Sequence, residues 1–415
     1  MSVARIEMLV IGDELLDGRV SDTNSTRFGR ALAGLGRRLA QVTTITDDVD
    51  AIVREVEAVI ARRTTLCVVS GGLGPTADDL TAAAFAKLAG VPLARDPETA
   101  AKIRAWLTKR GRAVGANQLK QADRPEGATL LVNSVGSAPG FRMELSGCSF
   151  VAAPGVPHEF DRMIGDAVVA PLAAEAGGWG RRHFSSYGLI EAEVDARLQE
   201  VAVRCPRVRT AFQVKFPEIH VVFVAPPEAA AELDLAAELA RERLGVHLFS
   251  MREESFAATV VGALFAAKAT LAVAESCTGG LVCDLLTDVP GASEVFLLGT
   301  VTYSDRAKRE MLGVEAQTLA IHGAVSEATV VAMAKGVRAK AGSTYAVAIS
   351  GIAGPSGGTP HKPVGTVHVA AIGPGLEVTK VLRLPFDRRG NKLVAAYAAL
   401  ELVRQHALGL WQDER

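Results

Sequence analysis

Continuous apolar runs alternate with segments of helical periodicity in the first part of the chain. Residues 49–62 carry apolar side chains at helical spacing, and another helix is expected after residue 25, with Asn24 or Ser25 as its cap. Three apolar runs predict buried strands, at Ile6–Ile11, Leu39–Thr46 and Leu66–Ser70. Strands that alternate with helices predict an α/β domain with a doubly wound parallel sheet. Ligands bind such sheets beyond the carboxyl ends of the strands, so the loops after these ends are the first candidate sites.

The middle of the chain shows a shorter pattern that begins after a glycine-rich boundary. Pro171 and the sequence Gly-Gly-Trp-Gly at 177–180 mark this boundary. Beyond it the pattern predicts strands at His183–Leu189, Val208–Val214 and Ile219–Ala225, and helices at Glu191–Val203 and Glu228–Leu244. This order indicates a small α+β module.

The last part of the chain returns to buried strands that are followed by helices. Leu271–Ala274 predicts a short strand, and residues 281–286 carry a helical apolar stripe. Further strands are expected at Val295–Thr302 and Tyr345–Ile349. The apolar tract Phe256–Ala274 contains Lys268, so we interpret it as a helix followed by a strand and not as a membrane span. The three patterns predict domains at residues 1–170, 171–252 and 253–415.

Composition indicates a globular protein of the cytoplasm. The 415 residues exceed one ordinary core; 49% are hydrophobic, 22% are charged, and the formal net charge is −1. This balance gives no support to non-specific nucleic-acid binding, which needs an excess of Lys and Arg. No signal-peptide pattern occurs at the N-terminus. The five cysteines form no Cys-x-x-Cys pair, which argues against a zinc site or a disulfide framework and fits a reducing cytoplasm.

Two loops after the first strands carry residues that suit phosphate and metal chemistry. Glycines in the loops at 12–14 and 71–81 allow a backbone to approach phosphate oxygens, and a helix N-terminus favours negative charge. Four carboxylates are predicted metal ligands, Asp13, Glu14, Asp78 and Asp79. The alternative is that Asp78 and Asp79 cap a helix and that Asp13 and Glu14 are a turn residue and a solvated charge.

A third candidate site lies where the strand Leu271–Ala274 meets the following helix. Ser276 occupies this turn, and unpaired backbone N–H groups at the start of a helix can hold an anion or an oxyanion. The alternative is that Ser276 or Thr278 simply caps the helix. Cys277 is kept as a second possible nucleophile. Ser-Gly-x-x-Gly-Pro occurs at both 70–75 and 350–355, which suggests one backbone solution to phosphate contact used twice.

The motifs of the first domain resemble the CinA family (competence/damage-inducible protein A). They are Gly-Asp-Glu-Leu-Leu at 12–16, Asp-Thr-Asn-Ser at 22–25 and Gly-Gly-Leu-Gly-Pro-Thr-x-Asp-Asp-Leu-Thr at 71–81. The resemblance implies a molybdopterin-binding-like fold and an ADP-ribose pyrophosphatase that uses a divalent metal such as Mg, Mn or Co. It also implies substrate-binding roles for Asn24, Gly71, Gly72, Gly74, Thr76 and Lys120.

The middle module resembles the small KH-like module of full-length CinA proteins. KH domains that bind RNA carry a Gly-x-x-Gly loop, and this module has none. We therefore expect a spacer or an oligomer-forming module. Its histidines, His183, His220 and His247, are scattered in the sequence and are interpreted as structural.

The last domain resembles the nicotinamide-mononucleotide (NMN) deamidase domain of the same family. The motifs are Glu-Ser-Cys-Thr-Gly-Gly at 275–280, Val-Thr-Tyr-Ser-x-x-x-Lys at 301–308, His-Gly-Ala-Val-Ser at 322–326 and Gly-Ile-Ala-Gly-Pro at 351–355. The resemblance implies Ser276 as nucleophile, Lys308 as base and Tyr303 as a helper, without a cofactor. The implied substrate-binding residues are Thr278, Gly279, Gly280, Gly351, Ala353, Gly354 and Arg388.

A lysine can activate this serine only in its neutral form. A serine hydroxyl is a poor nucleophile until a neighbour takes its proton. Burial or nearby positive charge can lower the pKa of a lysine enough for that task. Arg388 is expected either to supply this charge or to hold a substrate phosphate. Because Phe386 stands where the family usually has Gly before the Asp-Arg pair, the choice between Arg388 and Arg389 stays open.

These observations predict a bifunctional hydrolase of pyridine-nucleotide salvage. Its substrates would be NMN and ADP-ribose, and the family resemblance implies a homodimer. One alternative makes the first domain a molybdopterin-binding module without hydrolase activity. Another makes the chain a binding protein linked to competence or DNA damage.

Overall fold

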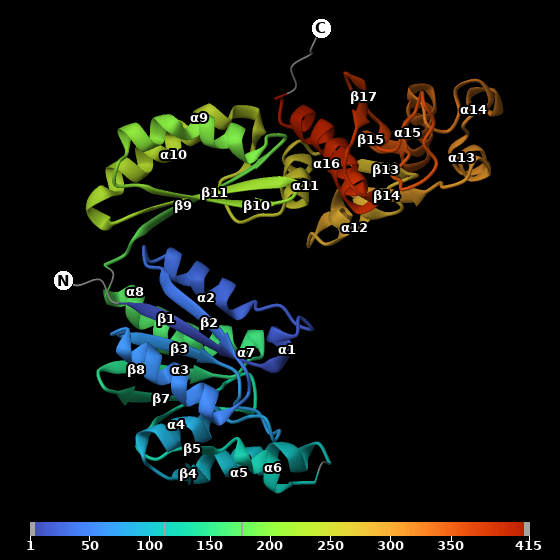
Figure 1. The fold of residues 1–415 in the computed structure, drawn as a ribbon. Coiled ribbons are helices and arrows are strands. Elements are labelled where there is room, and N and C mark those ends of the chain that lie inside the picture. The colour runs from blue at the N-terminus through green and yellow to red at the C-terminus, as the bar shows by residue number, and fades with distance from the viewer. Residues whose placement is uncertain (1–4, 112, 176, 411–415) are drawn as a thin grey trace. The chain divides into compact units, whose positions relative to one another are not determined.

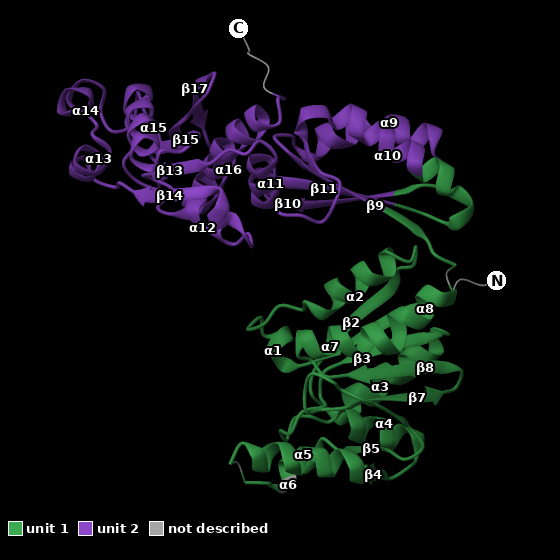
Figure 2. Cartoon of the chain, turned by 180° about the vertical axis from the view of Figure 1, so that it is seen from behind, with its two compact units in different colours: residues 1–181, 207–209, 224–233 green, residues 182–206, 210–223, 234–415 purple. Residues whose placement is uncertain are grey.

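The computed structural model describes residues 5–111, 113–175 and 177–410 (Figure 1). Residues 1–4, which belong to the N-terminus without a signal-peptide pattern, lie outside this description. The chain divides into two compact units, with residues 1–181, 207–209 and 224–233 in the first and the other residues in the second (Figure 2). The three domain boundaries expected from the sequence stay a prediction.

The first unit is built on a six-stranded sheet with the order β2-β1-β3-β8-β7-β6. The strands are β1 (Ile6–Ile11), β2 (Leu39–Ile45), β3 (Leu66–Ser70), β6 (Thr129–Leu131), β7 (Gly140–Leu145) and β8 (Cys148–Ala153). The pairs β1–β2 and β1–β3 are parallel, as predicted, and β3 also pairs parallel with β8, a strand that was not predicted. The pairs β6–β7 and β7–β8, which the sequence analysis did not address, are antiparallel, so the sheet as a whole is mixed.

Helices cover both faces of this sheet, because its central strands are apolar on both sides. They are α2 (Asn24–Ala33), α3 (Val49–Ala61), α4 (Thr81–Ala89), α7 (Pro157–Ile164) and α8 (Ala170–Glu175), with the short α1 (Asp13–Leu16). The further helices α5 (Pro97–Lys109) and α6 (Ala116–Lys120) lie beside the two-stranded sheet of β4 (Leu93–Arg95) and β5 (Asp123–Pro125), as Figure 1 shows. On one face Phe85 packs edge-on against Phe141 and Phe150.

Asn24 does not cap α2, and neither does Ser25. The backbone N–H of Ser25 donates to Asp22 Oδ1 at 3.0 Å, so Asp22 covers this end of the helix. The buried side chain of Asn24 instead donates to Ser70 Oγ and to the carbonyl of Gly155, both at 2.9 Å. Asn24 therefore ties together the loops at the carboxyl ends of β3 and β8.

The middle module forms a four-stranded sheet with the order β10-β11-β9-β12. Its elements are β9 (Gly180–Tyr187), α9 (Glu191–Arg204), β10 (Arg209–Lys215), β11 (Glu218–Ala225), α10 (Ala230–Leu244) and β12 (Leu248–Ser250). The sequence pattern missed β12 because three residues are too short to show a period. Two of the histidines meet in the folded module although they are 37 positions apart, since His183 Nε2 lies 3.0 Å from His220 Nδ1 in a buried cluster.

The C-terminal domain has a five-stranded sheet with the order β14-β13-β15-β16-β17. Its strands are β13 (Leu271–Glu275), β14 (Phe296–Val301), β15 (Tyr345–Gly351), β16 (Thr366–Gly373) and β17 (Leu376–Arg383). Its helices are α11 (Phe256–Ala266), α12 (Leu281–Thr287), α13 (Asp305–Leu312), α14 (Ala316–His322), α15 (Glu327–Ala341) and α16 (Arg388–Ala407). Within the described residues, no helix is both long and apolar enough to cross a membrane.

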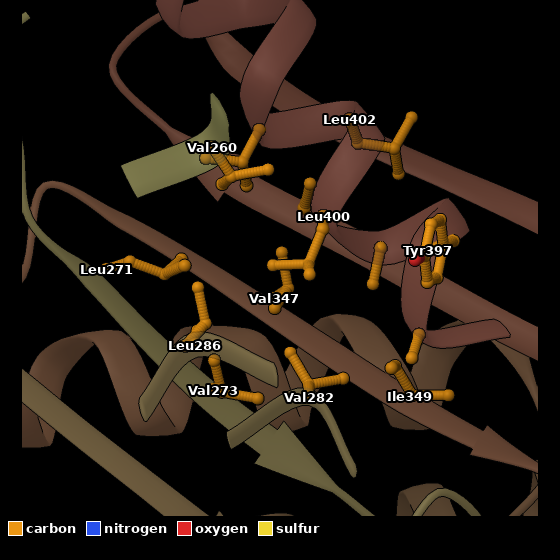
Figure 3. Close-up of a cluster of buried hydrophobic side chains, with 14 of the residues drawn as sticks. Val260, Leu271, Val273, Val282, Leu286, Val347, Ile349, Tyr397, Leu400 and Leu402 are labelled. Carbon is orange, nitrogen blue, oxygen red and sulfur yellow. The ribbon is translucent and has the colours of Figure 1, made fainter. Parts of the chain in front are cut away.

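The core of this domain holds β13 and β15 in place. Figure 3 shows Leu271 and Val273 of β13 and Val347 of β15 between residues of α12 and Leu400 of α16. Fully burying one such side chain stabilises the fold by about 1.5–3 kcal/mol. Because β13 is buried on both faces, the turn at its carboxyl end starts from a rigid base.

Candidate functional site

The turn after β13 presents Ser276 at the end of a buried strand. The backbone N–H of Ser276 donates to the carbonyl of Ile349 on β15 at 2.9 Å. Gly279 and Gly280 then adopt φ angles of 63° and 96°, a region that favours glycine. The chain reverses through these two residues, and α12 begins at Leu281. Ser276 is only 7% exposed.

Glu275, which sequence reasoning missed, caps α12. Its buried carboxylate accepts hydrogen bonds from the N–H of Gly280 at 2.9 Å and the N–H of Cys283 at 3.0 Å. Neither Ser276 nor Thr278 makes a capping hydrogen bond, so the alternative role that the sequence left open for them is wrong. The helix end is therefore closed by a residue of the protein.

Two of the predicted oxyanion donors are already engaged. The N–H of Gly280 donates to Glu275, and the N–H of Gly279 donates to the carbonyl of Ser276 at 3.1 Å. The buried hydroxyl of Thr278 has no hydrogen-bond partner in the part of the chain that the structure describes. Of the three predicted residues in this turn, Thr278 is the one with a side-chain donor left over for a ligand.

Lys308 reaches Ser276 from the neighbouring helix α13. Ser304 caps this helix by accepting a hydrogen bond from the N–H of Ala307 at 3.1 Å. Lys308 is 1% exposed, and its Nζ lies 3.2 Å from Ser276 Oγ. This separation is at the outer limit of the range of about 2.6–3.2 Å in which a base activates a nucleophile. Burial lowers the pKa of Lys308, while the negative charge of Asp305 opposes this shift.

Two backbone carbonyls orient the amine of Lys308. Nζ lies 2.9 Å from the carbonyl oxygen of Thr302 and 3.3 Å from that of Tyr303. A neutral amine has two N–H donors and one lone pair. In the neutral form, with both N–H groups donated to the carbonyls, the lone pair would face the hydroxyl of Ser276. The carbonyls thus take the orienting part that an aspartate plays in a serine–histidine–aspartate triad.

Tyr303 is paired with Arg388 and not with Ser276. Arg388 is the first residue of α16; its Nη2 donates to the hydroxyl of Tyr303 at 3.2 Å and its Nη1 donates to the carbonyl of Gly354 at 2.6 Å. Tyr303 is 62% exposed. Because burial accounts for the lowered pKa of Lys308, Arg388 is not needed for that purpose. These contacts favour Arg388 over Arg389 as the arginine of the candidate site. Of the two expected roles, they favour binding of a substrate phosphate.

The second Ser-Gly-x-x-Gly-Pro loop leads to a different kind of element from the first. The loop at 70–75 leads to α4, whereas the loop at 350–355 leads to β16, which pairs antiparallel with β15. The carbonyl of Ala353 accepts a hydrogen bond from Asn391 Nδ2 at 3.1 Å, and that of Gly354 accepts one from Arg388. The first loop therefore leads directly toward a helix, whereas the second meets the first turn of α16 through the side chains of Arg388 and Asn391.

A cavity of about 750 Å³ opens at the carboxyl ends of the parallel strands of the first unit. It is lined by the predicted residues Asn24, Gly71, Gly72, Gly74, Thr76, Glu14, Asp78 and Asp79. Asp13 and Lys120 are not part of its lining. Lys120 supports the glycine loop from outside, because its Nζ donates to the carbonyl of Thr76 at 2.8 Å.

The lining of this cavity is strongly acidic. It includes six carboxylates and no lysine or arginine among its described residues, the carboxylates being Glu14, Asp22, Asp47, Asp78, Asp79 and Glu159. Burial raises the pKa of Asp47, and the charges of Asp13, Glu14 and Asp78 raise it further. The described part of the lining therefore holds no positive side chain that would neutralise these carboxylates.

The predicted metal ligands fit a hard divalent cation by chemistry but do not form a closed site. Among the described residues, no group of three or more His, Cys, Asp or Glu side chains lies close enough to hold a metal ion. Asp79 orders the glycine loop, since its carboxylate accepts from the N–H groups of Gly74 and Thr76. The oxygen donors that remain for a cation are those of Glu14, Asp78 and Asp47, of which the sequence analysis missed the last.

Comparisons with known proteins decide the family. Residues 253–407 match the CinA C-terminal domain, and residues 7–174 match the probable molybdopterin binding domain. A CinA-like protein of Desulfosudis oleivorans is 42% identical over 97% of this chain and 99% of its own length. The chain belongs to the CinA family. A CinA-like protein of Myxococcus xanthus is 39% identical over 97% of this CinA chain and 98% of its own.

A solved structure is similar to part of this CinA chain. It is the competence/damage inducible protein CihA of Agrobacterium tumefaciens, which is 37% identical. The match covers 38% of this chain and 93% of that one, with a TM-score of 0.35.

Lys392 is a cation of the CinA site that the sequence analysis missed. Its Nζ lies 3.7 Å from the position that a Cβ on Gly279 would occupy, next to the turn that carries Ser276. Lys392 makes no hydrogen bond and no ion pair within the described ranges. It follows Arg388 by one helical turn on α16, and that spacing places two cations on one face of a helix. This spacing is the signal that could have revealed it.

Cys277 does not have the properties of a nucleophile in this CinA site. Burial raises the pKa of its thiol to about 12, although the charges of Lys392 and Arg388 act in the opposite direction. A thiolate is the reactive form of cysteine, and almost none exists at neutral pH with such a pKa. Of the two candidate nucleophiles in this turn, Ser276 is therefore the one that the structure favours.

Phe386, which replaces the glycine usual in the CinA family, contacts the middle module. Its ring centroid lies 4.8 Å from that of Phe216 in an edge-on arrangement. Phe216 belongs to the turn between β10 and β11. Phe386 therefore joins that turn to the segment just before Arg388.

Proposed function

We propose that the C-terminal domain hydrolyses the amide of NMN to nicotinate mononucleotide and ammonia. The observation that carries this proposal is the distance of 3.2 Å between Ser276 Oγ and the buried Nζ of Lys308. A serine beside a neutral amine is the arrangement needed for acyl transfer to a hydroxyl. The family resemblance supplies the substrate, and the cations Arg388 and Lys392 suit its phosphate.

The reaction follows from the positions of these groups. Lys308 takes the proton of Ser276 as Oγ attacks the amide carbon, and the hydroxyl of Thr278 is positioned in the same turn as a donor to the oxyanion. The resulting ammonium of Lys308 returns the proton to the leaving nitrogen, which departs as ammonia. A water molecule, deprotonated by the same amine, then cleaves the ester of Ser276. Nicotinate mononucleotide leaves, and the serine is regenerated.

Removing the charge of Asp305 is expected to move the acid limb of the pH profile toward lower pH. Asp305 raises the pKa of Lys308, so Asp305→Asn lowers that pKa and leaves more neutral amine at a given pH. The measurement is kcat/KM for ammonia release between pH 6 and 10. Because Asp305 is exposed, salt should reduce the difference from wild type. Glu310→Gln on the same helix is the control, and a limb that moves to higher pH in Asp305→Asn would contradict the assignment of Lys308.

The first domain has a second candidate function, hydrolysis of ADP-ribose to AMP and ribose 5-phosphate. The acidic cavity beside a glycine loop favours this function. A pyrophosphate can enter a cavity lined by six carboxylates only if a bound cation adds positive charge. A divalent cation that enters together with the pyrophosphate, with Glu14, Asp47 or Asp78 as a carboxylate ligand, would supply that charge and polarise a phosphoryl oxygen. The backbone of Gly71, Gly72 and Gly74 would approach the phosphates closely.

A chelator is expected to separate the two activities. EDTA should stop the release of AMP from ADP-ribose, because the acidic cavity then repels the pyrophosphate. Ammonia release from NMN should persist, since Lys308, Arg388 and Lys392 provide its positive charge. Both products are measured on one preparation with and without Mg, Mn or Co. Loss of both activities, or of neither, would contradict the assignment of a metal-dependent activity to the first domain and a metal-independent activity to the C-terminal domain.

A further inference from the structure

Helix α5 presents an aromatic ring to the cavity of the first unit. Trp106 lines the cavity and is 43% exposed, whereas its neighbours Ile103 and Leu107 are buried in the same wall. The guanidinium carbon of Arg110, one helical turn further along, lies 3.8 Å from the centroid of the Trp106 ring. This cation–π contact covers one face of the indole with the guanidinium.

The cavity therefore has two chemically different ends. The end at the strands consists of the glycine loop and of the carboxylates Glu14, Asp47 and Asp78. The wall formed by α5 is apolar and ends in a large flat ring. A ligand that matches both ends carries a polar, anionic part and a flat, aromatic part. A volume of about 750 Å³ is also within the ordinary range for a cofactor-sized ligand, about 300–1,000 Å³.

We propose that Trp106, held by Arg110, is the stacking platform for the nucleobase of the nucleotide bound in this cavity. The inference rests on the proposed ADP-ribose function. It also specifies the orientation of the substrate in the cavity. The adenine lies against α5, and the pyrophosphate lies toward the glycine loop. Arg110 covers one face of the indole, so the base stacks on the other. Any purine nucleotide of this length satisfies the platform, whereas a sugar phosphate alone leaves it unused.

The test measures binding without turnover. The probe is the α,β-methylene analogue of ADP-ribose, whose P–C–P linkage resists hydrolysis, and ribose 5-phosphate is the probe without a base. Calorimetry of the full-length chain is expected to show that Trp106→Ala lowers the affinity for the analogue by about 5- to 150-fold. This factor corresponds to about 1–3 kcal/mol for one stacked base. Trp106→Phe should restore most of the affinity. Binding of ribose 5-phosphate should be unchanged in both variants.

The chain offers a matched control for this experiment. Trp179 also faces an arginine, with the guanidinium of Arg209 5.2 Å from its ring centroid, but it does not line the cavity. Trp179→Ala should bind the analogue like wild type. Equal affinity of wild type and Trp106→Ala, or an equal loss for ribose 5-phosphate, would overturn the inference. Wild type that binds a pterin but not the analogue would also overturn it, whereas an inactive domain that still shows the Trp106 effect would overturn only the hydrolase proposal.

Discussion

Ser276→Ala is expected to abolish ammonia release from NMN, with a loss in kcat of about 10³- to 10⁶-fold, the range seen when a hydrolase loses its nucleophile. The reason is that no other group of the turn can attack the amide, since the thiol of Cys277 stays protonated. The fold should survive, because the change removes one hydroxyl whose hydrogen bond is worth about 0.5–1.5 kcal/mol. Ammonia is measured by a coupled assay, and the thermal midpoint checks the fold.

The controls for Ser276→Ala lie in the same chain. Ser343→Ala removes a buried hydroxyl that donates to the carbonyl of Tyr345 at the opposite end of β15, and it should keep full activity. Release of AMP from ADP-ribose should be unaffected in both variants. Mass spectrometry of wild type quenched during turnover should show the acyl group on Ser276. Undiminished ammonia release by Ser276→Ala would contradict the role of Ser276 as the nucleophile.

Lys308→Met is expected to lower kcat/KM for NMN by about 10²- to 10⁴-fold, the contribution of a positioned general base. Methionine has a similar length and no lone pair of suitable basicity, so Ser276 keeps its proton. The acid limb of the pH profile should disappear with the amine, because that limb reports the titration of Lys308. Lys308→Arg should be equally inactive, since a guanidinium stays charged and cannot accept a proton.

Measurement of kcat/KM from pH 6 to 10 distinguishes a base from a structural lysine. A merely structural role would lower the rate at every pH and keep the acid limb. Lys335→Met on α15 is the matched control, because Lys335 is exposed and pairs with Glu377. Lys308→Met with more than a tenth of the wild-type rate, or with an unchanged limb, would contradict the role of Lys308 as the base.

Much of the fold could be predicted from local patterns. The strands Ile6–Ile11, Leu66–Ser70 and Leu271–Ala274 are continuous apolar runs, and all three are buried strands in the structure. The direction of the strands toward one end of each sheet could not be predicted. Whether β7 or β16 runs parallel or antiparallel to its neighbour depends on the path of the chain between them, which leaves no period in the sequence.

The candidate site shows a similar division. The motifs identified Ser276, Lys308 and Arg388, yet the roles of Glu275, Asp47 and Lys392 were missed. Glu275 is at the end of a strand and its carboxylate turns back to cap the next helix, so its role depends on a turn geometry. Asp47 matters because Asp13, Glu14 and Asp78 are near it in space. Such long-range groupings appear only when the chain is folded.

By itself, the sequence determined the family, the α/β class and the choice of Ser276 and Lys308 as the candidate nucleophile and base. It could do so because motifs and apolar runs are local properties. The tertiary structure decided what those residues touch. Ser276 and Lys308 are 32 positions apart, and only the pairing of β13 with β14, the strand that precedes α13, brings the amine to 3.2 Å from the hydroxyl. Burial of that amine is also a tertiary property. It lowers the pKa of Lys308 because the charged form loses its water, and no pattern along the chain records that loss.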